Sequence, residues 1–174
     1  MVVQDDLCVQ QINDYLRSKC PTGKKAAIED LLSDAKSSGV GIIIREHMLN
    51  LPPPLLPMMH ESLCNDIDWA RENAEDDLEA KDANFEHLII LAPLSYSEEV
   101  PTRPKSGVNS EKKQKKASIK MFDRFDDEIL VEASSWGFEF TANSSNGPKS
   151  FYAAILSMKS YRRCIGSIRA LVGH

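Results

Sequence analysis

A phosphate-binding loop is the first chemistry that the residue types of this chain suggest. Residues 147–150 (GPKS) end like the nucleotide-binding motif G-x-x-x-x-G-K-S/T. The first glycine of that motif is missing, and Pro148 has no amide hydrogen to donate to a phosphate. The glycine patterns of dinucleotide sites and of serine hydrolases do not occur in the sequence either. Residues 147–150 are therefore predicted to form a turn rather than a phosphate site.

A second segment comes closer to a cofactor-binding pattern. Acetyltransferases of the GNAT superfamily hold the coenzyme A pyrophosphate with backbone amides of the pattern Q/R-x-x-G-x-G/A. Residues 163–168 (RCIGSI) follow this pattern except at the last position, where the side chain of Ile168 would block close approach to the backbone. The segment also falls inside an expected helix rather than at a helix start with free amides. No cofactor is predicted, and a degenerate acetyltransferase stays open as the alternative.

The metal-binding and acid–base residues show no spacing that would assemble a site. His60-Glu61 does not continue to the zinc motif H-E-x-x-H, because Cys64 stands where the second histidine would be. Carboxylates occur in runs rather than as two groups in contrasting surroundings, so no catalytic pair is expected. The cysteines are expected to be reduced thiols, with Cys8 and Cys164 on apolar helix faces. The residues considered are His47, His60, His87, His174, Cys8, Cys20, Cys64 and Cys164.

Charge is strongly segregated along the chain, although the net charge is only −5. Residues 61–86 hold ten acids and two bases, whereas residues 103–120 hold seven bases and one acid. Such blocks are typical of solvated or partner-facing segments rather than of a core. An acidic surface can shield the lysines and arginines of a basic protein and steer its approach. The predicted partner surface consists of Glu72, Glu75, Asp76, Asp77 and Glu79.

The basic block contains one short motif, KKQKK at residues 112–116. Lysine-rich segments in a mobile linker can be bound by an import receptor, so the motif predicts import into the nucleus. The alternative is a solvated basic loop. Direct nucleic-acid binding is a weaker interpretation, because the chain is acidic overall and its aromatic residues lie in strands that are expected to be core. The predicted import signal consists of Lys112, Lys113, Lys115 and Lys116.

Helical and strand periodicities predict the elements that position these residues. Helices are expected over residues 9–20, 27–35, 56–70, 126–133 and 161–172. The acidic stretch 72–82 is expected to continue the third helix or to fray from it. Strands are expected over residues 40–44, 85–93, 119–122, 136–142 and 151–156, with a mobile basic linker at about 97–117 and a turn at 143–149.

This order predicts one α/β domain over residues 1–174, with a mixed β-sheet covered by helices, because crossover connections and a hairpin both occur. The runs 40–44 and 88–91 are apolar at every position, so both faces of each strand are expected to be buried. No apolar run reaches the ~20 residues of a membrane span, and the N-terminus lacks the basic and apolar regions of a signal peptide. No membrane association is expected.

Two stretches of the chain resemble the BCCIP family. Residues 41–59 (GIIIREHMLNLPPPLLPMM) are similar to the family's apolar strand, polar pair, Asn-x-Pro-Pro turn and proline-entered helix. Residues 125–140 are similar to its acidic helix start and the aromatic strand that follows. A lysine-rich linker lies between the two stretches, as it does in the family.

The resemblance implies a GNAT-like fold without acetyltransferase activity, so the protein is not expected to be an enzyme. It also implies a nuclear adaptor or chaperone, shuttling to the cytoplasm, that works through protein partners such as a basic large-subunit ribosomal protein and a nuclear import receptor. The implied roles are ribosome biogenesis, nuclear export of a cargo protein, cell-cycle control and DNA repair.

Family members carry an acidic N-terminal tail and a further α/β segment before the first helix of this chain. The resemblance therefore implies that this segment is missing and that the sheet is incompletely covered. Uncovered strand edges and apolar patches are sites of association. The isolated chain is accordingly expected to be less stable than a longer relative and to self-associate or bind chaperones.

Overall fold

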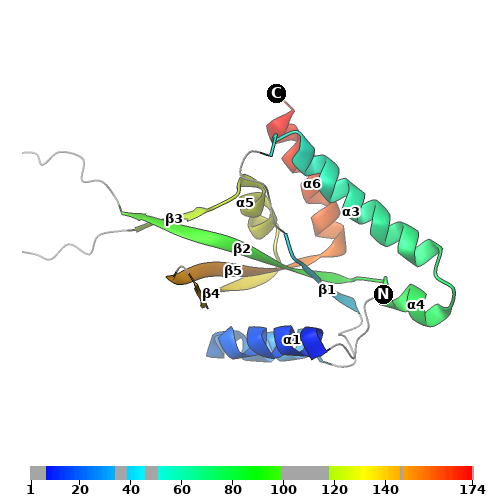
Figure 1. The fold of residues 1–174 in the computed structure, drawn as a ribbon, viewed down its shortest axis with the longest axis horizontal. Helices are drawn as coiled ribbons and strands as arrows, with labels where there is room; N and C mark the ends of the chain where they lie inside the picture. The colour runs from blue at the N-terminus through cyan, green and yellow to red at the C-terminus, as the bar shows by residue number, and fades with distance from the viewer. Residues whose placement is uncertain (1–6, 34–38, 46–50, 99–117, 146, 174) are drawn as a thin grey trace, which may run out of the picture.

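The computed structural model describes residues 7–33, 39–45, 51–98, 118–145 and 147–173 (Figure 1). Its helices are α1 (Leu7–Lys19), α2 (Lys25–Leu31), α3 (Leu55–Glu72), α4 (Asp77–Asp82), α5 (Phe125–Glu132) and α6 (Met158–Val172), with a short 3-10 turn η1 (Thr22–Lys24). Its strands are β1 (Val40–Ile43), β2 (His87–Glu98), β3 (Ser118–Phe122), β4 (Trp136–Ser144) and β5 (Gly147–Ser157).

The strands form one mixed sheet in the order β1-β2-β5-β4, with β3 also paired to β2. β1 runs parallel to β2, and the other pairs are antiparallel. Leu94 of β2 pairs with Phe122 on one side and with Ser150 on the other. β3 therefore lies on the same edge of β2 as β1, further along the strand, and β2 and β3 extend together beyond the helices (Figure 1).

Helices cover both faces of this sheet, and each face has its own core. On one face α1 and α2 bring Leu16 and Ile28 against Ile155 of β5. On the other face α3, α5 and α6 surround a second cluster that includes Leu130 and Ile90. Figure 1 shows α1 on one side of the sheet and α3, α5 and α6 on the other. The predicted mixed α/β fold with a helix-covered sheet is confirmed.

β1 is less buried than its apolar sequence predicts. Within the described residues it pairs only with β2, so it is an edge strand, and most of its residues are half-buried. Ile44, directly after β1, is 79% exposed. Burial of 40–44 on both faces is therefore a wrong expectation. The expectation for residues 88–91 holds in β2 for Leu88, Ile89 and Ile90, which are buried, whereas Leu91 is half-buried.

Several element boundaries and side chains also differ from expectation. α2 ends at Leu31 instead of continuing to residue 35. Ser97 and Glu98, expected in the basic linker, belong to β2, and residues 99–117 lie outside the described residues. Cys8, expected on an apolar face, is exposed. Met59 is also exposed, although its spacing from Leu56 and Leu63 in the expected helix 56–70 predicts that it belongs to the apolar stripe of that helix.

The β4–β5 hairpin is longer than the sequence indicates. β5 begins at Gly147 rather than at residue 151, because the expected turn of seven residues is a tight connection after Ser144. Gly147 has φ of 101°, a backbone conformation that glycine adopts without strain. Within the described part of the chain, no helix has the length and apolar character to span a membrane.

Candidate partner surface and buried charge cluster

The predicted partner surface lies at the corner where α3 ends and α4 begins. α3 stops at Glu72, and the acidic stretch does not continue it, because Asp76 caps a new helix. The Asp76 carboxylate accepts a hydrogen bond from the amide of Glu79 at 2.8 Å, which satisfies a donor that the first turn of a helix leaves free. The Glu79 carboxylate in turn accepts from the amide of Glu75 at 2.8 Å. Two of the predicted carboxylates therefore build the corner itself.

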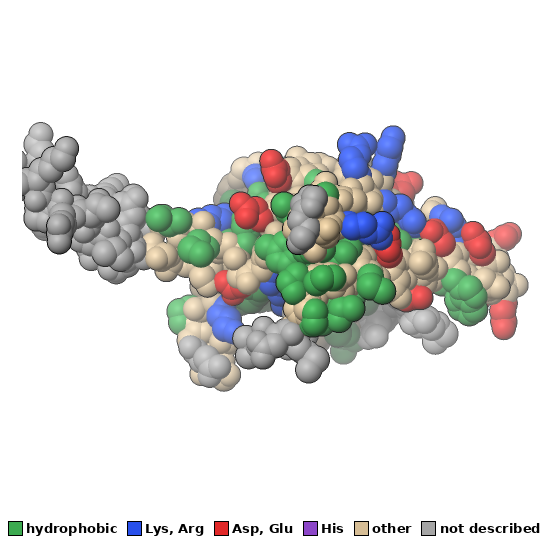
Figure 2. All heavy atoms as spheres, turned by 90° about the horizontal axis from the view of Figure 1, so that it is seen from above, with side chains coloured by type: hydrophobic (Ala, Val, Ile, Leu, Met, Phe, Trp, Pro, Cys, Tyr) green, Lys and Arg blue, Asp and Glu red, His purple; other side chains and the backbone are tan. Residues whose placement is uncertain are grey.

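All five predicted carboxylates are exposed, and the corner brings them together within one short segment. Two large apolar side chains of the same region are exposed with them, Trp69 at 66% and Leu78 at 67%. In Figure 2 acidic side chains gather at the end of the molecule where Figure 1 has α4, with hydrophobic side chains beside them. The name acidic corner is used below for Glu72, Glu75, Asp76, Asp77 and Glu79.

The predicted import signal (Lys112, Lys113, Lys115 and Lys116) lies outside the described residues.

A second group of charged residues is buried between the helices above the sheet. Arg45 follows β1, His60 comes from α3, Asp126 and Asp127 from the first turn of α5, and Tyr161 from α6. The side chains of both aspartates are fully buried, and the Arg45 side chain is 9% exposed. These five residues, called the buried charge cluster, tie the chain after β1 to three helices.

Hydrogen bonds and ion pairs link all members of the buried charge cluster. One Arg45 nitrogen lies 2.5 Å from Asp126 Oδ2, and the other terminal nitrogen pairs with Asp127. His60 Nε2 lies 3.3 Å from Asp126 Oδ2, and His60 Nδ1 lies 2.6 Å from the Tyr161 hydroxyl. Because an ionised carboxylate only accepts, His60 donates Nε2–H to Asp126, and in the tautomer with its proton on Nε2 it accepts from the Tyr161 hydroxyl through Nδ1. The network is continuous from Tyr161 to Asp127.

One guanidinium faces two carboxylates in this cluster, so the charges do not balance. Burial raises the pKa of Asp127 to about 6, the neighbouring Asp126 raises it further, and Arg45 opposes both effects. Among the described residues, Asp127 Oδ2 and Arg45 Nε have no hydrogen-bond partner. Burial also raises the pKa of the Tyr161 hydroxyl above its usual range. Both aspartates are fully buried, so the cluster holds α3, α5 and α6 together.

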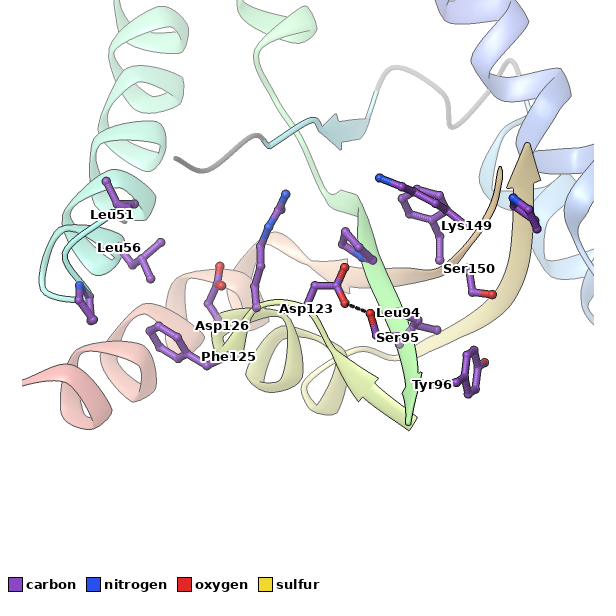
Figure 3. Close-up of a pocket in the computed structure, with 15 residues that line it drawn as sticks. Leu51, Leu56, Leu94, Ser95, Tyr96, Asp123, Phe125, Asp126, Lys149 and Ser150 are labelled. Atoms are coloured by element: carbon purple, nitrogen blue, oxygen red, sulfur yellow. Dashed lines mark hydrogen bonds between the residues drawn. The ribbon is translucent and has the colours of Figure 1, made fainter. Parts of the chain in front are cut away.

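A cavity of about 780 Å³ adjoins the cluster at Asp126 (Figure 3). It opens between the start of α3, the β3–α5 turn, the second half of β2 and the first half of β5. Figure 3 shows Leu56 and Asp126 at one side of it and Tyr96 and Lys149 at the other. Its charged lining is mixed, because Asp123 lies beside Arg124 and Lys149. This mixture selects no single ligand charge.

The start of α3, which adjoins the cavity, offers no amide to a phosphate. Pro54 and Pro57 have no amide hydrogen, and the amides of Leu55 and Leu56 already donate to the carbonyls of Pro52 and Pro53, at 2.9 and 3.1 Å. An anion site at a helix start needs free amides. Residues 163–168 lie inside α6, as predicted, and Ile168 is fully buried. Neither segment can hold a pyrophosphate as the acetyltransferase pattern does.

The buried charge cluster was not predicted from the sequence, where Asp126 and Asp127 look like an ordinary acidic helix start. The available signal was Arg45, a charged residue directly after an apolar strand, but its partners stand about 80 positions later. The exposed Trp69 was missed as well, although helical spacing places it on the side of α3 away from the buried Leu56 and Cys64.

The comparisons with known proteins agree with the resemblance in the sequence. The BCCIP family model matches residues 2–130, about three quarters of the chain. The chain belongs to the BCCIP family. It is 26% identical over 141 residues to "Protein BCCIP homolog" of Arabidopsis thaliana, covering 81% of this chain and 42% of that protein. It is 27% identical over 151 residues to "Protein bcp1" of Aspergillus fumigatus, covering 83% and 49%.

A solved structure supports the fold of this BCCIP family member. The crystal structure of BCP1 from Saccharomyces cerevisiae aligns with a TM-score of 0.53 and 15% sequence identity, covering 96% of this chain and 62% of that one. At this identity the likeness concerns the fold alone. The chain spans less than half the length of these two curated relatives.

Proposed function

We propose that this BCCIP family member is a non-catalytic protein-binding adaptor or chaperone that receives a basic protein on its acidic corner. Family membership supports a protein-binding role in general. The observation that carries the proposal is the exposure of five carboxylates together with Trp69 and Leu78 on one corner. Exposed tryptophan is enriched among the residues that dominate binding energy at protein interfaces. A solvated acidic loop would not need it.

A large-subunit ribosomal protein is the kind of partner that suits this surface. Before assembly such a protein exposes lysines and arginines meant for phosphate, and these bind carboxylates instead. Complementary charge raises the association rate and suppresses wrong partners, and the effect weakens as salt rises. The apolar side chains at the corner add binding energy that salt does not screen. The other roles that the resemblance implies, nuclear export, cell-cycle control and DNA repair, would likewise act through proteins.

Charge reversal at the corner tests the proposal. The structure singles out Glu72 and Glu75, because reversing them leaves the Asp76 and Glu79 carboxylates of the α4 cap in place. The double variant Glu72→Lys/Glu75→Lys should bind purified basic large-subunit ribosomal proteins about tenfold more weakly, with a flatter salt dependence. Fluorescence anisotropy over a salt titration measures both.

A matched variant separates this surface from net charge. Glu128→Lys/Glu132→Lys makes the same charge change on the exposed side of α5 and should leave affinity within about twofold. Hen lysozyme serves as a basic protein of unrelated shape. Equal losses in both double variants, or equal affinity for lysozyme, would mean that the acidic corner is not a specific site.

The non-catalytic part of the proposal has its own test. The amides at the start of α3 are absent or bonded, and Ile168 is buried inside α6, so neither segment offers coenzyme A a pyrophosphate site of the acetyltransferase kind. A calorimetric titration with acetyl-coenzyme A should release no heat of binding. Measurable binding would instead favour the degenerate acetyltransferase.

We also propose nuclear localisation through Lys112, Lys113, Lys115 and Lys116. The support is the lysine run in the sequence and the resemblance to a nuclear family. A large fluorescent reporter fused to the chain should concentrate in nuclei, and the fusion with all four lysines changed to alanine should stay outside. Equal distribution of the two fusions would show that the lysines are only a solvated basic loop.

A further inference from the structure

α3 is apolar on two opposite sides. Its inner side contributes Leu56 and Cys64 to the core. Its outer side carries Leu55, Met58, Met59 and Trp69, all exposed. A surface helix of a folded domain ordinarily has one apolar stripe, and a helix that is apolar around its circumference is covered on all sides. The outer side of α3 therefore has the composition of an interface.

The outer residues follow one helical face. Leu55, Met58, Met59, Ser62 and Trp69 recur at steps of three, four and seven, so they lie in one stripe. From Leu55 to Trp69 the stripe is about 21 Å long, or about four helical turns. In Figure 2 hydrophobic side chains gather over the middle of the molecule and again at the end that Figure 1 assigns to α4. The stripe leads from an apolar end to the acidic corner.

Charge gives this stripe a direction. The first six residues of α3 up to His60 contain no acid or lysine or arginine, whereas Asp66 and Glu72 are exposed in its second half. The acidic corner continues from there, and Arg71, the basic residue of this half, is already paired with Asp68 at 3.1 Å. A complementary partner is apolar opposite Leu55, Met58 and Met59 and basic toward Asp66 and the acidic corner.

We propose that the outer stripe of α3 docks an amphipathic helix of a basic partner protein, with the partner's basic end over the acidic corner and its apolar end over Leu55, Met58 and Met59. This inference rests on the proposed function and specifies the partner segment. Exposed methionines suit it, because their flexible thioethers adapt to the shape of a bound helix.

A helix fits this stripe better than an extended segment does. The backbone amides and carbonyls of α3 are bonded within the helix, so they cannot pair with an added strand. A helical partner satisfies its own backbone and needs only side-chain contacts, which a regular stripe provides. A stripe of about four turns accommodates a partner helix of about 15 to 18 residues.

A second copy of this chain is a poor occupant of the stripe. Placed parallel, two α3 helices would set Glu72 of each copy beside acids of the other. Placed antiparallel, they would bury the acids of one copy against Met58 and Met59 of the other. Both arrangements desolvate carboxylates without a cationic partner, which is unfavourable.

Synthetic peptides of about 18 residues provide the probe. The first peptide has leucines on one helical face and lysines and arginines clustered at one end. The second has the same composition with leucine and lysine alternating, so that no helical face forms. The third carries glutamate in place of each base. Both chain directions of the first peptide are made, and anisotropy is measured at low and moderate salt.

The first peptide, in one chain direction, should bind at least about tenfold more tightly than the second and third. Met58→Asp and Trp69→Ala should each weaken it about tenfold. Met121→Asp on β3 is the matched control, because Met121 is 53% exposed and Met58 59%; it should change binding less than about twofold. Equal binding of the alternating peptide, or an unchanged Met58→Asp, would overturn the inference.

Two further outcomes separate this inference from the proposed function. Glu72→Lys/Glu75→Lys could weaken binding of ribosomal proteins while Met58→Asp and Trp69→Ala do not. That result would support the acidic corner as a binding surface and overturn helix docking on the outer stripe of α3. If light scattering shows dimers that Met58→Asp turns into monomers, the stripe is covered by a second copy, and the inference is overturned. Thermal unfolding of the variants at Glu72, Glu75, Met58 and Trp69 should match that of the original chain, since all four residues are exposed.

Discussion

Adjacent aspartates begin two helices of this protein, and the two pairs lie in opposite surroundings. Asp126 and Asp127 at the start of α5 are completely buried and paired with Arg45. Asp76 and Asp77 at the start of α4 are exposed, and Asp76 caps the helix with its own carboxylate. Both pairs gain from the positive end of a helix dipole. Burial, which depends on residues far away in the sequence, decides whether they stabilise the core or stay exposed at the surface.

The buried and the exposed aspartate pairs should contribute differently to stability. An exposed carboxylate is hydrated in both the folded and the unfolded state. Its removal therefore changes the free energy of unfolding by a few tenths of a kcal/mol or, at a helix cap, by about 1 kcal/mol. A buried carboxylate depends on its cation, because leaving it unpaired costs several kcal/mol. Substitutions in the two regions should therefore differ in size by several-fold.

Removal of Arg45 should have the largest effect. Arg45→Ala leaves two buried carboxylates without their guanidinium, and the free energy of unfolding should fall by about 3 to 5 kcal/mol. Urea unfolding at neutral pH measures it. The control is Arg71→Ala, which breaks the exposed pair with Asp68 and should cost less than about 1 kcal/mol. Equal losses would mean that Asp126 and Asp127 are hydrated in solution.

Asp127→Asn should raise stability at neutral pH. The pKa of Asp127 is about 6 in the fold against 3.8 for the free group, so the folded state holds this proton more tightly than the unfolded state. The stability that this proton adds to the folded state is fully present below about pH 4 and is lost as the pH rises through about 6. The asparagine variant mimics the protonated acid. Its free energy of unfolding should equal that of the original chain near pH 4 and be larger by up to about 3 kcal/mol near pH 7.5.

Unfolding curves at several pH values test whether stability falls as the pH rises through the pKa of Asp127. Besides burial, the charged groups that influence this pKa are Arg45, Asp126 and Arg124. A variant that is less stable than the original chain at pH 7.5 would mean that Arg45 needs both carboxylates ionised, and that the raised pKa is wrong in direction.

Tyr161→Phe should have an intermediate effect. It removes the hydroxyl that lies 2.6 Å from His60 Nδ1 and leaves that buried nitrogen without a donor. The expected loss is about 1 to 3 kcal/mol. Tyr152→Phe is the matched control, because Tyr152 contacts Phe122 through its ring and should lose less than about 0.5 kcal/mol. Equal losses would show that ring packing, rather than the His60 contact, matters at residue 161.

Local patterns in the sequence predicted the order of the elements, because periodicity is a property of neighbouring residues. The helix with Leu16, the strand at 88–91 and the last helix with Ile168 all occur where apolar spacing placed them. The exposure of Cys8 and Met59 was not predicted, because a residue on an apolar stripe is buried only where another element covers it.

The acidic corner and the buried charge cluster differ in the same way in how far the sequence predicts them. The acidic corner could be found from composition, since a run of carboxylates without bases is visible in the sequence. The buried charge cluster could not, because Arg45, His60 and Asp126 are each unremarkable in their own segments and meet only through the fold. Long-range pairing of single residues leaves no periodic signal.

The smallest effect is expected at Asp76, where capping and charge can be separated. Asp76→Ala removes the side chain that accepts from the Glu79 amide and should destabilise α4 by about 1 kcal/mol. Because α4 lies at an exposed corner and buries no residue, this loss should appear as faster hydrogen exchange of α4 amides, with urea unfolding of the whole chain nearly unchanged.

Asp76→Asn completes the separation, because asparagine caps a helix as well as aspartate does but carries no charge. Exchange of the α4 amides should stay as in the original chain, while affinity for a basic protein should fall about twofold at low salt and recover as salt rises. Faster exchange in Asp76→Asn would mean that the charge of Asp76, rather than its hydrogen bond, holds α4. In that case the acidic corner would resemble the buried pair at α5 in depending on electrostatics for its own structure.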